Sequence, residues 1–299
     1  MTLALDRHAT LDVSSLEKEE LEVSTITLYQ RDDALFRGTV IAVNAEYICY
    51  GIKGGMIRVI NRTDAQRALL RGFSKHVVDM AFAPPAVAAA EDGDEDGEEE
   101  SESLLAAVAN DGNLFLWSLS STDGTLEPTM LTQRDVAPVT AVGSAACDRV
   151  CWKPAAGGAD GKHVLVTVFG NGTNVTLAAV DPSTSQVTLG ELQLELGGSD
   201  PQNAVRHLAF SRDGAVLALA QERTVRVVDV RGVSAASIVS GAAKGALRTN
   251  VIVQTGLDGP LSFVCPLAVG VLLIGACGNT KLALMEQQQQ QADDDGPYE

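Results

Sequence analysis

The stretch YICYGIKGGMIRVINRTDAQRALLRG, residues 47–72, contains the pattern on which the fold prediction rests. Two short apolar runs, Tyr47 to Ile52 and Met56 to Ile60, meet at a Lys-Gly-Gly turn, and a polar segment follows them. Runs of this length between turn residues are typical of β-strands, and glycine adopts the positive φ of a tight turn at no steric cost. The stretch therefore predicts a β-hairpin in which Gly54 and Gly55 form the turn.

The same arrangement of three short apolar runs, with a polar or glycine turn before the third, recurs along the 299 residues. The further copies comprise residues 77–82, 104–109 and 114–119; 149–152, 163–169 and 174–181; 205–210, 215–220 and 224–230; and 261–265, 269–277 and 281–286. One such sheet cannot bury both of its faces, whereas sheets stacked radially bury each other's apolar positions. The sequence therefore predicts an all-β fold, a β-propeller with about five recognisable blades.

The number of blades stays open at this stage. Propellers hold up to about eight blades, so five units leave three alternatives. Two further blades can be too diverged to recognise, which would give seven; the ring can be open; or the chain can be a truncated product. An open ring would leave unpaired strand edges, which favour aggregation or pairing with another chain.

Charge and composition divide the chain into three parts. The run EDGDEDGEEESE, residues 91–102, supplies nine of the 17 excess negative charges, and such a block repels itself and is typical of a disordered insertion. The tail after residue 286 is glutamine-rich and of low complexity. We therefore expect a partly disordered N-terminal extension over residues 1–34, a propeller over 35–286 with an acidic disordered insertion at 91–102, and a low-complexity tail over 287–299.

The composition also restricts where the protein is located in the cell and which kinds of partner it can bind. No basic region followed by a long apolar stretch begins the chain, and the five cysteines contain no CxxC pair, so we expect an intracellular protein with reduced thiols. The apolar stretch 261–277 is shorter than a membrane span needs and contains Pro266, so no membrane segment is expected. The acidic balance predicts no strong direct binding to nucleic acid.

No enzyme signature is complete. The Gly-rich segments 155–163 and 169–174 lack the spacing of a phosphate loop or of a dinucleotide fingerprint. The four histidines are far apart and form no metal-ligand pattern. The sequence therefore predicts a protein that is not an enzyme and that has no cofactor, no metal and no catalytic residue.

One group of basic residues suggests an interaction surface. Five cations lie within 18 residues with only one acid among them: Arg58, Arg62, Arg67, Arg71 and Lys75. If the fold gathers them on one face, they can bind an acidic peptide or a phosphate, and otherwise they are ordinary solvated surface.

The residues 41–82, IAVNAEYICYGIKGGMIRVINRTDAQRALLRGFSKHVVDMAF, together with LLAAVANDGNLFLWSL at 104–119, resemble a known family. They are similar to the WD-repeat domain of the enhancer of mRNA decapping scaffolds, called Hedls in animals and Varicose in plants. The resemblance implies a WD40-type propeller. In that pattern Asp111 and Gly112 form a polar turn, and Trp117 packs between blades.

The sequence also departs from that family. Phe73 stands where WD repeats place the histidine of Gly-His, so the usual polar network from histidine to aspartate is not expected in that blade. The acidic insertion at 91–102 lengthens a connection that the family keeps short. The family also continues into a helical region that binds partners, so self-association is expected through a region missing here.

The resemblance implies a non-enzymatic scaffold of the mRNA decapping machinery, which binds the decapping enzyme and decapping activator proteins and promotes removal of the 5′ cap. It also implies a cytoplasmic location, in processing bodies. The alternative is a WD-repeat propeller unrelated to decapping, which binds other proteins or phosphoinositides. The propeller face that binds, the peptide bound and the oligomeric state stay open.

Overall fold

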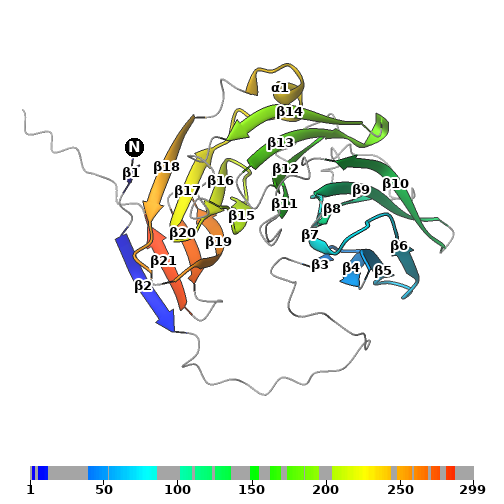
Figure 1. Cartoon of the computed structure of the whole chain (residues 1–299), viewed down its shortest axis with the longest axis horizontal. Helices are drawn as coiled ribbons and strands as arrows, with labels where there is room; N and C mark the ends of the chain where they lie inside the picture. Colours follow the sequence, from blue (N-terminus) through cyan, green and yellow to red (C-terminus); the bar gives the residue numbers. More distant parts are fainter. Residues whose placement is uncertain are drawn as a thin grey trace, which may run out of the picture.

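The strands of the chain form five separate sheets (Figure 1). The computed structural model describes residues 2–3, 6–12, 40–52, 54–85, 102–109, 112–122, 125–135, 149–154, 162–169, 174–184, 186–194, 204–243, 248–257, 259–268, 271–276 and 281–286. Within these residues the fold is almost entirely β, with one short helix and one 3-10 turn.

Each sheet is built from strands that follow one another in the chain, and the last two each add a strand from the N-terminal end. The first sheet contains β3 (Ile41–Val43), β4 (Tyr47–Ile52), β5 (Met56–Asn61) and β6 (Arg67–Leu70). The second contains β7 (Val77–Phe82), β8 (Ser103–Ala109), β9 (Asn113–Thr122) and β10 (Thr125–Asp135), and the third contains β11 (Arg149–Trp152), β12 (His163–Phe169), β13 (Asn174–Asp181) and β14 (Gln186–Leu194). The fourth contains β15 (His207–Phe210), β16 (Val216–Ala220), β17 (Thr224–Asp229), β18 (Arg248–Gln254) and β1 (Thr2–Leu3). The fifth contains β19 (Leu261–Ala268), β20 (Val271–Ala276), β21 (Lys281–Glu286) and β2 (Asp6–Asp12).

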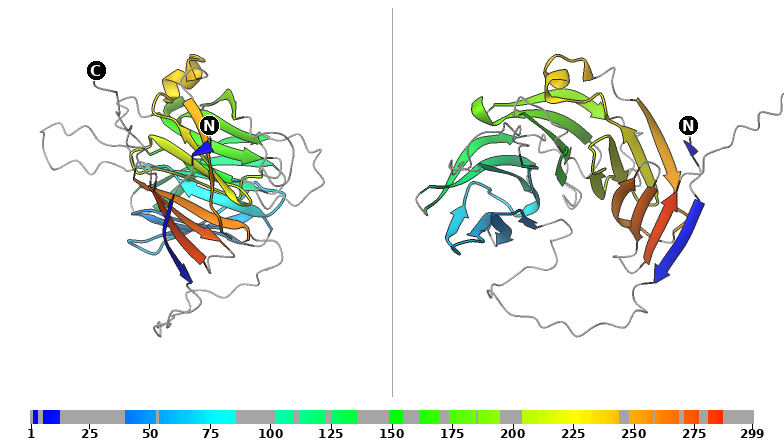
Figure 2. Two further views of the ribbon diagram at one scale, coloured as in Figure 1. Left: turned by 90° about the vertical axis from the view of Figure 1, so that its left-hand side faces the viewer. Right: turned by 180° about the vertical axis from the view of Figure 1, so that it is seen from behind.

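The five sheets stand side by side in an arc (Figure 1; Figure 2, right). Strands β3, β7, β11, β15 and β19 lie on the inside of the arc, whereas the strands at the outer edge are β6, β10 and β14 in the first three sheets and the N-terminal strands β1 and β2 in the last two. We call β3, β7, β11, β15 and β19 the inner strands. This arrangement confirms the predicted β-propeller architecture, and the predicted runs of all five copies coincide with strands.

The fifth sheet obtains its outer strand from the start of the chain. Strand β2 pairs antiparallel with β21, from Asp6 opposite Glu286 to Asp12 opposite Lys281. The predicted N-terminal extension over residues 1–34 therefore contains a strand of the propeller, and the boundary at residue 35 leaves that strand out. The sequence of β2 could not indicate this, since its pairing partner lies at the other end of the chain. Residues 91–101 and 287–299 lie outside the described residues.

Four hydrophobic clusters fill the four spaces between neighbouring sheets. Between the first and second sheets lie Tyr47, Ile57, Leu105 and Trp117, among others. Equivalent clusters join the second to the third sheet, the third to the fourth and the fourth to the fifth. The core of the protein is therefore divided among the interfaces between sheets.

Strands of the middle sheets contribute to two clusters at once. In β9, Leu114 and Leu116 belong to the cluster that faces the third sheet, whereas Phe115 and Trp117 belong to the cluster that faces the first. Because successive side chains of a strand point to opposite faces, a sheet covered on both faces requires a continuous apolar run. In the first sheet, by contrast, buried and partly buried residues alternate along β5.

Outer strands and the helix were not predicted. Only Leu126 is buried among the first six residues of β10, and the apolar pattern there is weak. Helix α1 (Ala235–Val239) follows β17 and lies over β13 and β14 (Figure 1). It begins at Ser234, whose hydroxyl accepts a hydrogen bond from the backbone N–H of Ser237 at 3.1 Å. Such capping is local chemistry that a repeat pattern does not reveal.

The glycine turn of the first sheet is held closely by the next loop. Gly54 and Gly55 have φ values of 84° and 73°. A Cβ on Gly55 would lie 2.2 Å from the carbonyl oxygen of Lys75, whereas a Cβ on Gly54 would meet only the terminal methyl of Met56, at 3.8 Å. Gly55 is thus required both for its backbone conformation and for the close approach of residues 73–75.

These two glycines provide a matched test of the turn. Gly54→Ala is expected to lower the free energy of unfolding by about 1–2 kcal/mol, because alanine tolerates positive φ poorly. Gly55→Ala is expected to lower it by at least about 2 kcal/mol more, because backbone atoms must also move. Denaturant unfolding of both variants measures the difference, and equal losses would contradict the role given to the close approach.

Candidate functional site

Side-chain hydrogen bonds connect successive inner strands of the arc. The carboxylate of Asp79 in β7 accepts a bond from the backbone N–H of Val150 in β11 at 3.0 Å. The Nε of Arg149 donates to the carbonyl of Arg206, directly before β15, at 3.0 Å. The inside of the arc is therefore tied from sheet to sheet by polar groups as well as by apolar packing.

His207 makes the next connection of the same kind. Its Nδ1 accepts a hydrogen bond from the backbone N–H of Val264 in β19 at 3.3 Å. Burial, with a smaller contribution from the nearby charge of Arg149, lowers the pKa of His207 to about 4. The imidazole is consequently neutral at physiological pH, and its free lone pair is used to hold the fourth and fifth sheets together.

Asp79, Arg149 and His207 were not predicted as a set. The available signal was the presence of charged or polar residues in the short apolar runs VVDMAF, RVCW and VRHLAF. A buried polar group needs a hydrogen-bonding partner, so each of these residues implied a specific contact, but the partner depends on how the sheets are arranged.

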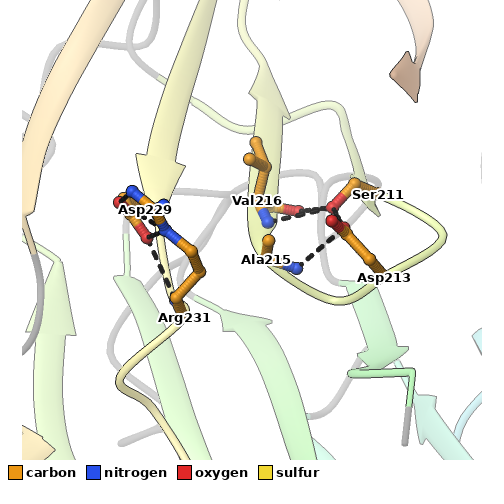
Figure 3. A network of polar contacts seen from close by, with 6 residues as sticks. All are labelled: Ser211, Asp213, Ala215, Val216, Asp229 and Arg231. Atoms are coloured by element: carbon orange, nitrogen blue, oxygen red, sulfur yellow. Dashed lines mark hydrogen bonds and ion pairs between the residues drawn. The ribbon is translucent and has the colours of Figure 1, made fainter. Parts of the chain in front are cut away.

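The turn between β15 and β16 is stabilised by a compact polar network (Figure 3). The hydroxyl of Ser211 donates to the carboxylate of Asp213 at 2.6 Å, and the same carboxylate accepts the N–H of Ala215 at 3.1 Å. The N–H of Val216 donates to the hydroxyl of Ser211 at 2.9 Å. The hydrogen bond from Ser211 is the largest of the effects that lower the pKa of Asp213, which is therefore ionised as a turn acceptor.

A second cluster lies at the same end of the fourth sheet. Asp229 and Arg231 form an ion pair (Figure 3). The ammonium of Lys153, from the third sheet, donates to the carbonyl oxygens of Val230, at 2.9 Å, and Val233. Burial lowers the pKa of Lys153. These groups hold the loop before α1 at this end of the fourth sheet.

The five predicted cations are not gathered at one end of the sheet. Arg62 lies in the turn after β5 and donates to the carbonyls of Asn44 and Ala45 at 2.7 and 3.0 Å, so it joins two turns of the first sheet. Arg71 and Lys75 lie at the opposite end, in the loop after β6 that packs on Gly55. All three side chains are exposed.

Arg58 lies within β5, and Arg67 begins β6 beside the turn that contains Arg62. Both are in strands of the first sheet, and both are on the face that is directed away from the second sheet. The Nε of Arg58 is buried and has no hydrogen-bond partner among the described residues.

The predicted turn at Asp111 and Gly112 is described only in part. Asp111 lies outside the described residues, whereas Gly112 has a φ of 81°.

An aromatic cluster occupies the interface beside the predicted Trp117. Trp117 is 2% exposed, and its ring stacks on Phe115 with a centroid distance of 5.3 Å. Phe73, at the position where WD repeats place a histidine, packs edge-on against Phe115 at 4.1 Å and Trp117 at 5.6 Å. A Cβ on Gly72 would lie 2.6 Å from the Phe115 ring, so the close approach of the chain at residue 72 depends on glycine. In this interface, aromatic packing therefore replaces the polar network that WD repeats form between histidine and aspartate.

No group of three or more His, Cys, Asp or Glu side chains within the described ranges is placed to hold a metal ion. Burial raises the pKa of Cys49 and Cys151 to about 12, so these thiols are protonated and unreactive at neutral pH. No helix in the described part of the chain is long and apolar enough to cross a membrane.

The repeated four-stranded sheets with their inner strands side by side define a WD40-type β-propeller. The family model described as the WD40 region of Ge1, enhancer of mRNA-decapping protein, matches residues 18–230, and the chain belongs to this family. Residues 18–230 include the first three sheets and the inner three strands of the fourth.

Two relatives and one solved structure are similar to parts of this chain. The chain is 29% identical over 119 residues to enhancer of mRNA-decapping protein 4 of Danio rerio, a match that covers 38% of this chain and 8% of that protein. The Homo sapiens protein of the same name is 26% identical over 117 residues, 38% of this chain and 7% of that protein. The chain therefore spans less than a tenth of these relatives. The crystal structure of Chaetomium thermophilum Sqt1 aligns with a TM-score of 0.51 at 16% identity, over 82% of this chain and 58% of that one, which concerns the fold alone.

Titration of His207 gives a test of the polar connections between inner strands. The folded protein holds His207 neutral to about pH 4, whereas the unfolded chain protonates near pH 6.5. Stability is therefore expected to fall by up to about 3 kcal/mol as the pH decreases from 6.5 to 4, since only the unfolded state gains the proton.

His207→Asn keeps a hydrogen-bond acceptor but does not titrate, so it serves as the matched variant. Its free energy of unfolding, measured by urea titration at several pH values, is expected to depend less on pH over this window. An unchanged slope in the variant would show that other groups cause the acid loss.

Proposed function

We propose that this chain is a non-enzymatic scaffold of the mRNA decapping machinery. The observation that carries the proposal is the match of residues 18–230 to the WD40 region of a family described as enhancer of mRNA-decapping protein. The relatives with this name are much longer than the matched region, so their role is transferred here as a proposal for the propeller alone.

The structure supports a scaffold role through its surfaces. At one end of the fourth sheet the turns are held by hydrogen bonds and an ion pair, which supports its use as a surface for binding peptide segments. The described polar groups act as turn acceptors, caps and connections between sheets, and protonated buried thiols offer no nucleophile. The proposed partners are the decapping enzyme and decapping activator proteins, in the cytoplasm and in processing bodies.

Affinity purification of the tagged chain from its own cells, with and without RNase, tests this proposal. Decapping subunits are expected among the recovered proteins in both samples, because the contact proposed is between proteins. Recovery only without RNase would mean that RNA makes the connection, and no recovery in either sample would contradict the proposal.

Two double variants assign the contact to an end of the first sheet. Arg71→Gln with Lys75→Gln changes one end, and Arg62→Gln with Arg67→Gln changes the other, with equal loss of charge. If exposed cations contribute to partner binding, one double variant is expected to reduce recovery several-fold while the other retains it. Full recovery with both variants would exclude these cations as the contact.

A further inference from the structure

We draw no further inference here: the strongest candidate, the face of the first sheet that is directed away from the second sheet and carries the exposed side chains of Ile41 and Val43, is a face on which the sheets of this fold pack against one another, and nothing in the structure shows what covers it.

Discussion

Burial of both faces of each middle sheet is the constraint on which the rest of the structure depends. A four-stranded sheet has two faces, and here the second, third and fourth sheets each contribute side chains to two separate clusters. None of these sheets has a core of its own, so each is stable only between two neighbours. The loss of one interface therefore weakens the sheets on both sides of it, and polar bonds such as that from Asp79 to Val150 keep the neighbours in register.

The same constraint explains which parts of the fold can be predicted from the sequence. In the middle sheets the inner three strands are short apolar runs, for example HVLVTVF at 163–169, because side chains on both faces are buried. The first six residues of the outer strand β10 are exposed except for Leu126, so this strand resembles a polar loop in sequence. Strand β2 could not be predicted at all, since nothing in residues 6–12 indicates a partner near residue 281.

For the candidate site, features set by neighbouring residues could be predicted from the sequence, whereas contacts between residues far apart in the chain could not. The Lys-Gly-Gly turn implies positive φ at Gly54 and Gly55, which the structure contains. The spacing of the five cations between Arg58 and Lys75 did not reveal whether they lie on one face of the protein. A short strand, Arg67–Leu70, separates Arg62 from Arg71 and carries them to opposite ends of the sheet. Likewise the bonds of Arg149 and His207 join residues 57 positions apart, so only the three-dimensional arrangement reveals them.

The pairing of β2 with β21 has a consequence for the order of folding during synthesis. Strand β2 is made about 270 residues before its partner β21. At roughly 5–20 residues per second, the ribosome needs on the order of 15 to 50 seconds to reach that partner. The first four sheets can assemble in sequence during this interval, each on the one before, while β2 waits without its pairing strand. The fifth sheet is therefore completed by a strand that is made before the other four sheets, and any factor that binds β2 during this interval acts directly on the completion of that sheet.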